Sequence, residues 1–154
     1  MSPVAAEARD PQPGDIEALL ADIRPADLAE GEALGGAGQV PRMLADSVKA
    51  SVHPQTVEAD GKVVCMFGVA PIGMLADQAL VWMVGTSLVE TNRRALTRIG
   101  RAYIARMLHA YPTLMNVVDQ RNDKAIRWLK ATGFTVHPAQ PIGGAMFHPF
   151  TLGA

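Results

Sequence analysis

Apolar runs bounded by turn residues predict strands in the middle of the chain. Residues 55–58 and 62–69 flank the dipeptide Asp60-Gly61, and this arrangement predicts a β-hairpin. Residues 78–84 are apolar at odd and even positions alike, which indicates a strand that is covered on both faces. We therefore expect residues 78–84 to lie centrally in a sheet, with Trp82 in the core.

Helical spacing of apolar residues predicts one long helix over residues 92–110, which Tyr111-Pro112 ends. Its expected buried stripe is Leu96, Ile99, Tyr103, Met107 and Ala110. The opposite side carries three basic residues, Arg94, Arg98 and Arg101. A solvated face is the simplest interpretation of these arginines, and a surface for nucleic acid or an acidic protein is the alternative.

Three shorter helices are expected earlier in the chain. Asp15 is predicted to cap the first, Pro25 to start the second, and residues 43–52 to form the third. The glycine cluster at residues 35–38 has no Lys-Ser/Thr ending and follows no strand, so we interpret it as a connection between helices. Residues 1–14 are expected to be a flexible arm or a first strand near residues 4–8.

The last third of the chain predicts a β-α-β unit. Residues 114–118 form an apolar strand, Asn122 stands where a helix N-cap belongs, and Gly133 supplies the left-handed residue that closes the helix. Residues 147–152 are expected to form a closing strand after a loop at residues 141–144.

Composition narrows the class of protein. At 154 residues with 49% hydrophobic content, the chain is expected to form a single α/β domain over residues 15–154. Its net charge of -1 gives no global argument for binding nucleic acid. Cys65 lies in an apolar run and is expected to be buried. The four histidines show no ligand spacing, so no metal site is expected.

The pattern Asn122-x-x-Ala125, followed by Gly133-Phe134, resembles the second half of the GCN5-related N-acetyltransferase (GNAT) fold. The order of the other predicted elements agrees with this resemblance. It implies a mixed sheet of six or seven strands flanked by helices, and a site for acetyl-CoA. In that family an Arg/Gln-x-x-Gly-x-Gly/Ala loop before the long helix binds the pyrophosphate through backbone N–H groups.

The sequence departs from the family pattern at three places. Residues 87–92 contain no glycine, and Glu90 adds a negative charge that Arg93 and Arg94 compensate in part. Leu129 stands where the family commonly has a tyrosine that protonates the leaving thiolate, and a leucine cannot do so. Residues 78–84 include no ionisable residue to act as a base. We therefore expect a degraded acyl-CoA site and no bound cofactor.

A narrower resemblance covers most of the chain from Ile23 onward. It is to a GNAT-related family of tailed bacteriophages that includes internal virion proteins of short-tailed phages. The residues that carry it are Arg24-Pro25-x-Asp27 with Glu30, Met66-Phe67-Gly68-Val69, Trp82 with Gly85-Thr86, Tyr111-Pro112, Val118-Asp119 with Arg121-Asn122, and Ala125-Ile126-Arg127-Trp128-Leu129. The resemblance implies a virion structural or assembly protein, found in the particle and the host cytoplasm. Its partners would be portal, tail or internal head proteins.

The alternative is an acetyl-CoA-dependent N-acyltransferase. Under this hypothesis, splayed strands around Val84 and Asn116 hold the pantetheine, Asn122 contacts the cofactor, and Arg93 and Arg94 face its phosphates. Whether acetyl-CoA binds discriminates between the two functions.

Overall fold

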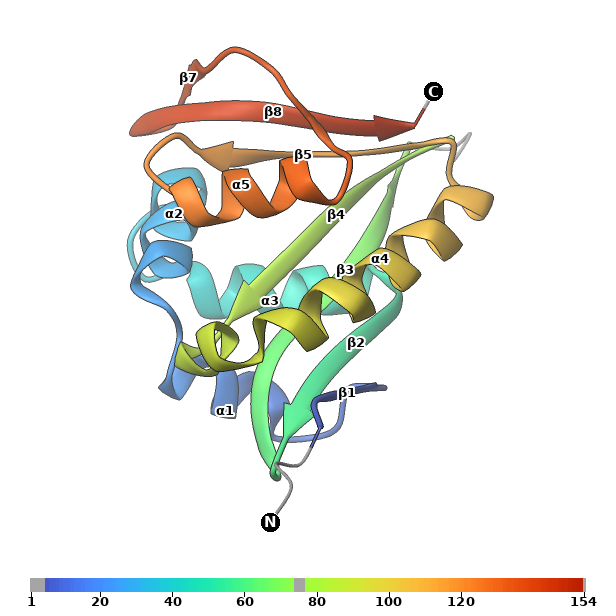
Figure 1. The fold of residues 1–154 in the computed structure, drawn as a ribbon. Coiled ribbons are helices and arrows are strands. Elements are labelled where there is room, and N and C mark those ends of the chain that lie inside the picture. Colours follow the sequence, from blue (N-terminus) through green and yellow to red (C-terminus); the bar gives the residue numbers. More distant parts are fainter. Residues whose placement is uncertain (1–4, 74–76, 154) are drawn as a thin grey trace.

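The structure is a computed structural model that describes residues 5–73 and 77–153. Helices and strands follow the order expected from the sequence, with eight strands rather than six or seven (Figure 1). The elements are β1 (Glu7–Arg9), α1 (Asp15–Ala21), α2 (Pro25–Gly35), α3 (Val40–Ala50), β2 (Val52–Ala59), β3 (Lys62–Ile72), β4 (Gln78–Gly85), the 3-10 helix η1 (Ser87–Asn92), α4 (Arg93–Ala110), β5 (Thr113–Asp119), α5 (Asp123–Ala131), β6 (Thr135–Val136), β7 (Gln140–Ile142) and β8 (Ala145–Gly153).

All eight strands belong to one mixed sheet. Its order is β1-β2-β3-β4-β5-β8-β6, with β7 paired to β8, so β4 is central as predicted. Among the described strands only β4 and β5 run parallel, and the remaining neighbours are antiparallel. The predicted hairpin is present as β2 and β3, and its turn residues Asp60 and Gly61 both have positive φ, as such a turn requires.

Helices cover both faces of the sheet and create two cores (Figure 1). The larger core packs α4 and α5 against one face and includes the buried Tyr103, Met107 and Leu129. The smaller core packs α1 and α3 against the other face around Leu19, Leu44 and Met66. Trp82 packs on this second cluster but is only half-buried, so it is less enclosed than the sequence predicted.

The first helix starts differently from the prediction. Its N-cap is Gly14, and the predicted cap Asp15 is the first helical residue. The Asp15 carboxylate is buried, pairs with Arg9 at 2.8 Å and accepts a hydrogen bond from the Thr56 hydroxyl at 2.7 Å. Asp15 therefore ties β1, α1 and β2 together, a role that depends on residues distant in sequence.

The bounds of three other elements and one buried position of the long helix are corrected. The third helix begins at Val40, where a proline in the first turn favours initiation, and ends before residue 52, which belongs to β2. The predicted loop at residues 141–144 contains part of β7, because that segment pairs with the following strand. In the long helix, Ala110 of the predicted buried stripe is exposed, whereas Ile104, which was not predicted in that stripe, is buried. The strand predicted near residues 4–8 lies partly outside the described residues, and the observed strand is Glu7–Arg9.

The predicted C-terminal unit is confirmed. Residues 113–119 form β5, the Asn122 side chain accepts the backbone N–H of Ala125 at 3.3 Å, and Gly133 has φ 102°. The Phe134 N–H then donates to the Leu129 carbonyl, which closes the helix end.

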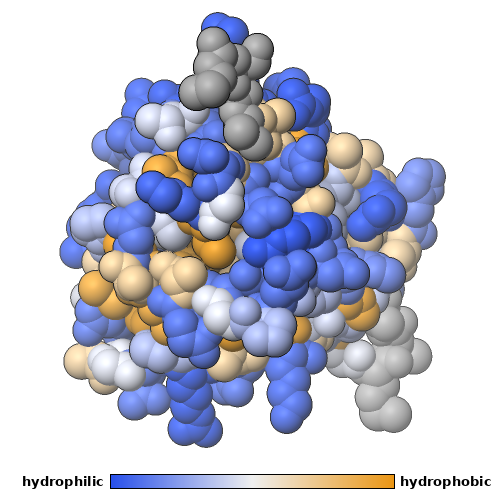
Figure 2. Space-filling view, turned by 90° about the horizontal axis from the view of Figure 1, so that it is seen from below, coloured by the Kyte–Doolittle hydropathy of each residue, from blue (hydrophilic) through white to orange (hydrophobic). Residues whose placement is uncertain are grey.

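The surface carries no broad apolar area on the face seen from below. Figure 2 shows that face as mostly hydrophilic, with apolar side chains in small separate groups. Within residues 5–73 and 77–153, no helix is long and apolar enough to cross a membrane.

Candidate functional site

The seam between the two parallel strands of the sheet opens into a gap. Pairing between β4 and β5 covers only residues 78–80 and 113–115. Beyond these pairs β4 continues along β3, whereas β5 continues along β8, so the two strands separate toward their C-terminal ends (Figure 1). Residues 81–85 of β4 have no paired residue on β5. At about 3.3 Å per residue, this unpaired edge of β4 is roughly 16 Å long.

Asn116 marks the vertex of this gap. Its side-chain Nδ2 donates to the Val81 carbonyl at 2.8 Å, and its Oδ1 accepts the N–H of Val117 at 2.8 Å. The side chain thus takes the place of the next ladder hydrogen bond and allows the strands to part without leaving the Val81 carbonyl unpaired. The predicted site residue Asn116 therefore lies at the gap, with both polar atoms already engaged.

Backbone groups of β4 point into the gap. In a strand, alternate residues direct their N–H and C=O to the same side. The Val81 carbonyl and the Gly85 N–H both bond to groups on the β5 side. Met83 lies between these two residues in the alternation. Its N–H and C=O consequently face the open seam, where β4 has no paired residue of β5.

Helix α2 joins the far ends of the two strands. The Arg24 N–H donates to the Gly85 carbonyl at 2.9 Å, and the Gly85 N–H donates to Asp27 Oδ2 at 2.8 Å. Asp27 is buried and also pairs with Arg24 at 2.9 Å. Glycine is needed at position 85, because an added Cβ would lie 2.6 Å from Val89 and 3.1 Å from the Arg24 guanidinium.

Glu30 completes the connection on the β5 side. Its Oε1 accepts the backbone N–H of Asp119 at 2.6 Å, although the two residues are 89 positions apart. The Glu30 side chain is half-buried, whereas the carboxylate of Asp119 is buried and pairs with Arg121 at 2.6 Å. Two carboxylates of α2, those of Asp27 and Glu30, thus accept hydrogen bonds from the C-terminal ends of β4 and β5.

The three carboxylates differ in their ionisation. Burial raises the pKa of Glu30 to about 7, and the nearby Asp27 and Asp119 charges add to this rise. Burial also raises the pKa of Asp27, even though Arg24 opposes it. The Arg121 guanidinium, by contrast, holds the pKa of Asp119 below its usual value. Glu30 is therefore the carboxyl of this group poised to exchange a proton near neutral pH.

The segment between β4 and α4 forms a 3-10 helix, η1. The Thr86 hydroxyl caps it by accepting the Leu88 N–H at 3.3 Å. None of its described residues has a positive φ, so the turn forms without glycine. Glu90 pairs with Lys124 at 3.2 Å and approaches Arg93 to 4.0 Å, and these exposed contacts connect the starts of α4 and α5.

The other predicted site residues are dispersed around the gap. Arg93 and Arg94 are exposed at the start of α4, and Val84 packs toward the small core rather than into the seam. Asn122 uses its side chain as the cap of α5. Leu129 is buried in the larger core.

The predicted basic face of α4 is solvated in part. Arg94, Arg98 and Arg101 are all exposed, and Arg101 also donates to the Ala131 carbonyl at 3.2 Å. One of the three arginines thus links α4 to the end of α5.

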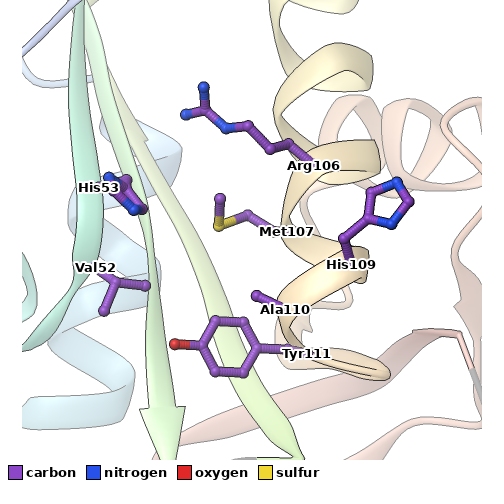
Figure 3. Close-up of a pocket in the computed structure, with 7 residues that line it drawn as sticks. All are labelled: Val52, His53, Arg106, Met107, His109, Ala110 and Tyr111. Carbon is purple, nitrogen blue, oxygen red and sulfur yellow. The ribbon is translucent and has the colours of Figure 1, made fainter.

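A separate hollow of about 500 Å³ lies at the C-terminal end of α4 (Figure 3). His53 of β2 and Arg106 of α4 point toward one another across it, beside Tyr111. Figure 3 shows His109 turned away from this space. Within the described part of the chain no group of three or more potential ligands could hold a metal ion. Cys65 is buried, and burial raises its pKa to about 12, so it is no nucleophile.

Comparison with solved structures decides the fold. A GCN5-related N-acetyltransferase from Kribbella flavida matches with a TM-score of 0.70 at 19% identity, over 97% of this chain and 98% of that one. The chain has the GNAT fold. Ard1 from Thermoplasma volcanium matches with a TM-score of 0.70 at 16% identity, over 98% and 99% of the two chains. A putative acetyltransferase from Salmonella typhimurium, solved with its cofactor acetyl-CoA, has a TM-score of 0.64 at 13% identity, over 97% and 94%.

These likenesses cover the whole GNAT fold, and at such identities they establish the fold alone. No family model matches the sequence, and no curated protein is significantly similar to it. None of the comparisons bears on a phage virion role or on the loss of the acyl-CoA site.

Glu30 was not among the site residues predicted from the sequence and entered only through the phage resemblance. A carboxylate on an early helix gives no local signal that it reaches β5. The absence of an ionisable residue in residues 78–84 was the available hint, since it left a base to be supplied from elsewhere in the chain.

Proposed function

We propose that this protein is an acyl-CoA-dependent N-acyltransferase that uses the gap between β4 and β5. The observation that carries the proposal is the gap itself. It is bordered by a backbone N–H at Met83 and by the carboxyl of Glu30, whose pKa burial raises to about 7, in a fold shared with acetyltransferases. The structural role expected from the sequence thereby becomes the second candidate.

The gap's chemistry fits an acyl thioester. A backbone N–H that faces the seam is a donor for a thioester carbonyl, and the separated strands expose further backbone groups for the amides of pantetheine. Arg93 and Arg94 at the start of α4 would face the phosphates, where the helix dipole also favours anions. When bound, acyl-CoA supplies the activated acyl carbon. The chain's residues orient it and receive the proton of the acceptor.

Two features of η1 favour the second candidate, a GNAT scaffold without acyl transfer. The segment lacks glycine, and Glu90 places a carboxylate beside the start of α4. The virion role, with portal, tail or internal head proteins as partners, belongs to this candidate and rests on the sequence resemblance alone. The two candidates differ in whether acetyl-CoA binds.

Thermal unfolding with and without acetyl-CoA tests the proposed function. A ligand at 100 times its dissociation constant stabilises the native state by about 2.7 kcal/mol. For a domain of this size that corresponds to a rise in Tm of roughly 5–10 °C. We expect a saturable rise, and no rise at millimolar acetyl-CoA would favour the scaffold.

Two arginines one helical turn apart provide a matched pair of variants. Arg94→Ala should weaken acetyl-CoA binding several-fold, because Arg94 lies in the first turn of α4. Arg98→Ala removes the same charge from the same exposed face one turn later and should leave binding unchanged. Equal effects of both variants would place the phosphates elsewhere.

A further inference from the structure

We propose that Glu30 of α2 is the base that accepts the proton of the acceptor amine, which enters beside α2. This inference rests on the proposed function and deepens it, because it assigns a base to the same gap. The GNAT fold alone does not identify that base, since the central strand β4 carries no ionisable residue.

Geometry places the Glu30 carboxylate at the mouth of the gap. One oxygen, Oε1, is held by the Asp119 N–H at 2.6 Å, which fixes the side chain against the end of β5. The side chain is half-buried, so part of Glu30 is exposed beside the end of β5. Met83 directs its N–H into the same seam from the other strand. In the proposed complex, Met83 holds the carbonyl and Glu30 holds the amine, and the two groups react between the strands.

The surrounding charges leave Glu30 without a cation. Asp27 pairs with Arg24, and Asp119 pairs with Arg121, so both neighbouring carboxylates are compensated. Among the described residues, Glu30 forms no ion pair within 4.0 Å. In the proposed complex, an ammonium group beside Glu30 forms an ion pair with its carboxylate and donates hydrogen bonds to it.

Other candidate bases fit less well. Glu90 is paired with Lys124 at 3.2 Å on the exposed surface beside η1. Asp27 is buried with all of its described contacts inside the protein, and Asp119 is held ionised by Arg121. Burial, together with the charges of Asp27 and Asp119, raises the pKa of Glu30 to about 7, although the hydrogen bond from the Asp119 N–H and the charge of Arg24 oppose the rise. A base of that pKa accepts a proton near neutral pH and returns it to water.

In the proposed reaction, the amine nitrogen forms a C–N bond with the acyl carbon. The C–S bond breaks, and its electron pair leaves on sulfur. The ammonium loses two protons, of which Glu30 takes the first and water the second. The thiolate takes one proton back from water, because Leu129 is apolar, so one proton is released overall.

Glu30→Gln is the variant that tests this assignment. A glutamine oxygen can still accept the Asp119 N–H, so the variant should fold and bind acetyl-CoA as the parent does. Glu32→Gln is the matched control, because it removes the same charge two positions away on the same helix. Release of thiol from acetyl-CoA is followed with a peptide bearing a free N-terminus, lysine and spermidine as acceptors. The single cysteine is buried and should add no signal.

We expect kcat/KM of the parent to rise tenfold per pH unit below about 7 and then to level off. Glu30→Gln should lower kcat/KM about 10²–10⁴-fold and remove this pH dependence, whereas Glu32→Gln should change neither. A ¹³C titration of glutamate carboxyls in the free protein should show one group near pH 7 that is absent from Glu30→Gln.

The outcomes separate the two proposals. No binding of acetyl-CoA would overturn both of them. Binding with an unchanged pH profile in Glu30→Gln, or with no amine acetylated, would overturn the role of Glu30 alone. Absence of a carboxyl that titrates near pH 7 would also overturn it.

Discussion

Removal of the Asp27 carboxylate should detach α2 from the sheet. Asp27 is buried, and its oxygens accept the Gly85 N–H at 2.8 Å and two Arg24 donors at 2.9 and 3.0 Å. Asp27→Ala leaves a buried N–H without an acceptor and a guanidinium without its counter-charge. Breaking a buried ion pair in this way costs about 3–5 kcal/mol, which includes the penalty of the groups left unpaired.

Solvent lowers this cost. The Arg24 side chain is 20% exposed, so water can partly replace its lost partner. We therefore expect Asp27→Ala to reduce the free energy of unfolding by about 3 kcal/mol, the lower end of that range. Asp27→Asn keeps an oxygen for the Gly85 N–H and loses the charge, so its loss should be smaller, about 1–2 kcal/mol.

Urea denaturation at 25 °C and pH 7 measures these losses. Asp46→Ala is the control, because Asp46 faces Arg42 at 3.8 Å with both side chains more than two-thirds exposed. That change should alter stability by less than about 0.5 kcal/mol. A loss in Asp27→Ala no larger than in Asp46→Ala would refute the role of Asp27 in holding α2.

Two further predictions concern stability. Trp82→Ala should cost about 3 kcal/mol in a denaturant titration, because the half-buried indole packs on the small core. Trp82→Phe should cost about 1 kcal/mol, since it loses the hydrogen bond from Nε1 to the Ser51 hydroxyl at 2.7 Å. A loss below about 1 kcal/mol in Trp82→Ala would contradict the packing. Asn122→Ala should cost about 1 kcal/mol, whereas Asn122→Asp keeps an acceptor for the Ala125 N–H and should lose little. Equal losses from these last two variants in thermal unfolding would contradict the cap.

Features that depend on neighbours in sequence were predicted well. The turn at Asp60-Gly61, the cap at Asn122 and the left-handed Gly133 each follow from the conformational preference of one or two residues. The two-sided apolar pattern of residues 78–84 likewise placed β4 in the middle of the sheet.

Features that depend on residues distant in sequence were not predicted. Aspartate is a residue type typical of helix N-caps. The Asp15 side chain nevertheless pairs with Arg9 and Thr56, and Thr56 is 41 positions away. Residues 141–144 were predicted as a loop and contain a proline and two glycines, yet residues 141 and 142 belong to a strand because they pair with β8.

The sequence by itself determined the order of helices and strands and which strand is central, because these depend on local periodicity and turn chemistry. Only the tertiary structure decided that β4 and β5 part after three residue pairs, and that α2 bonds to the far ends of both strands. The bond between Glu30 and Asp119 spans 89 positions, so no local pattern records it. A carboxyl with a pKa near 7 arises there because the folded chain buries Glu30 beside two other acids, an environment that exists only after folding.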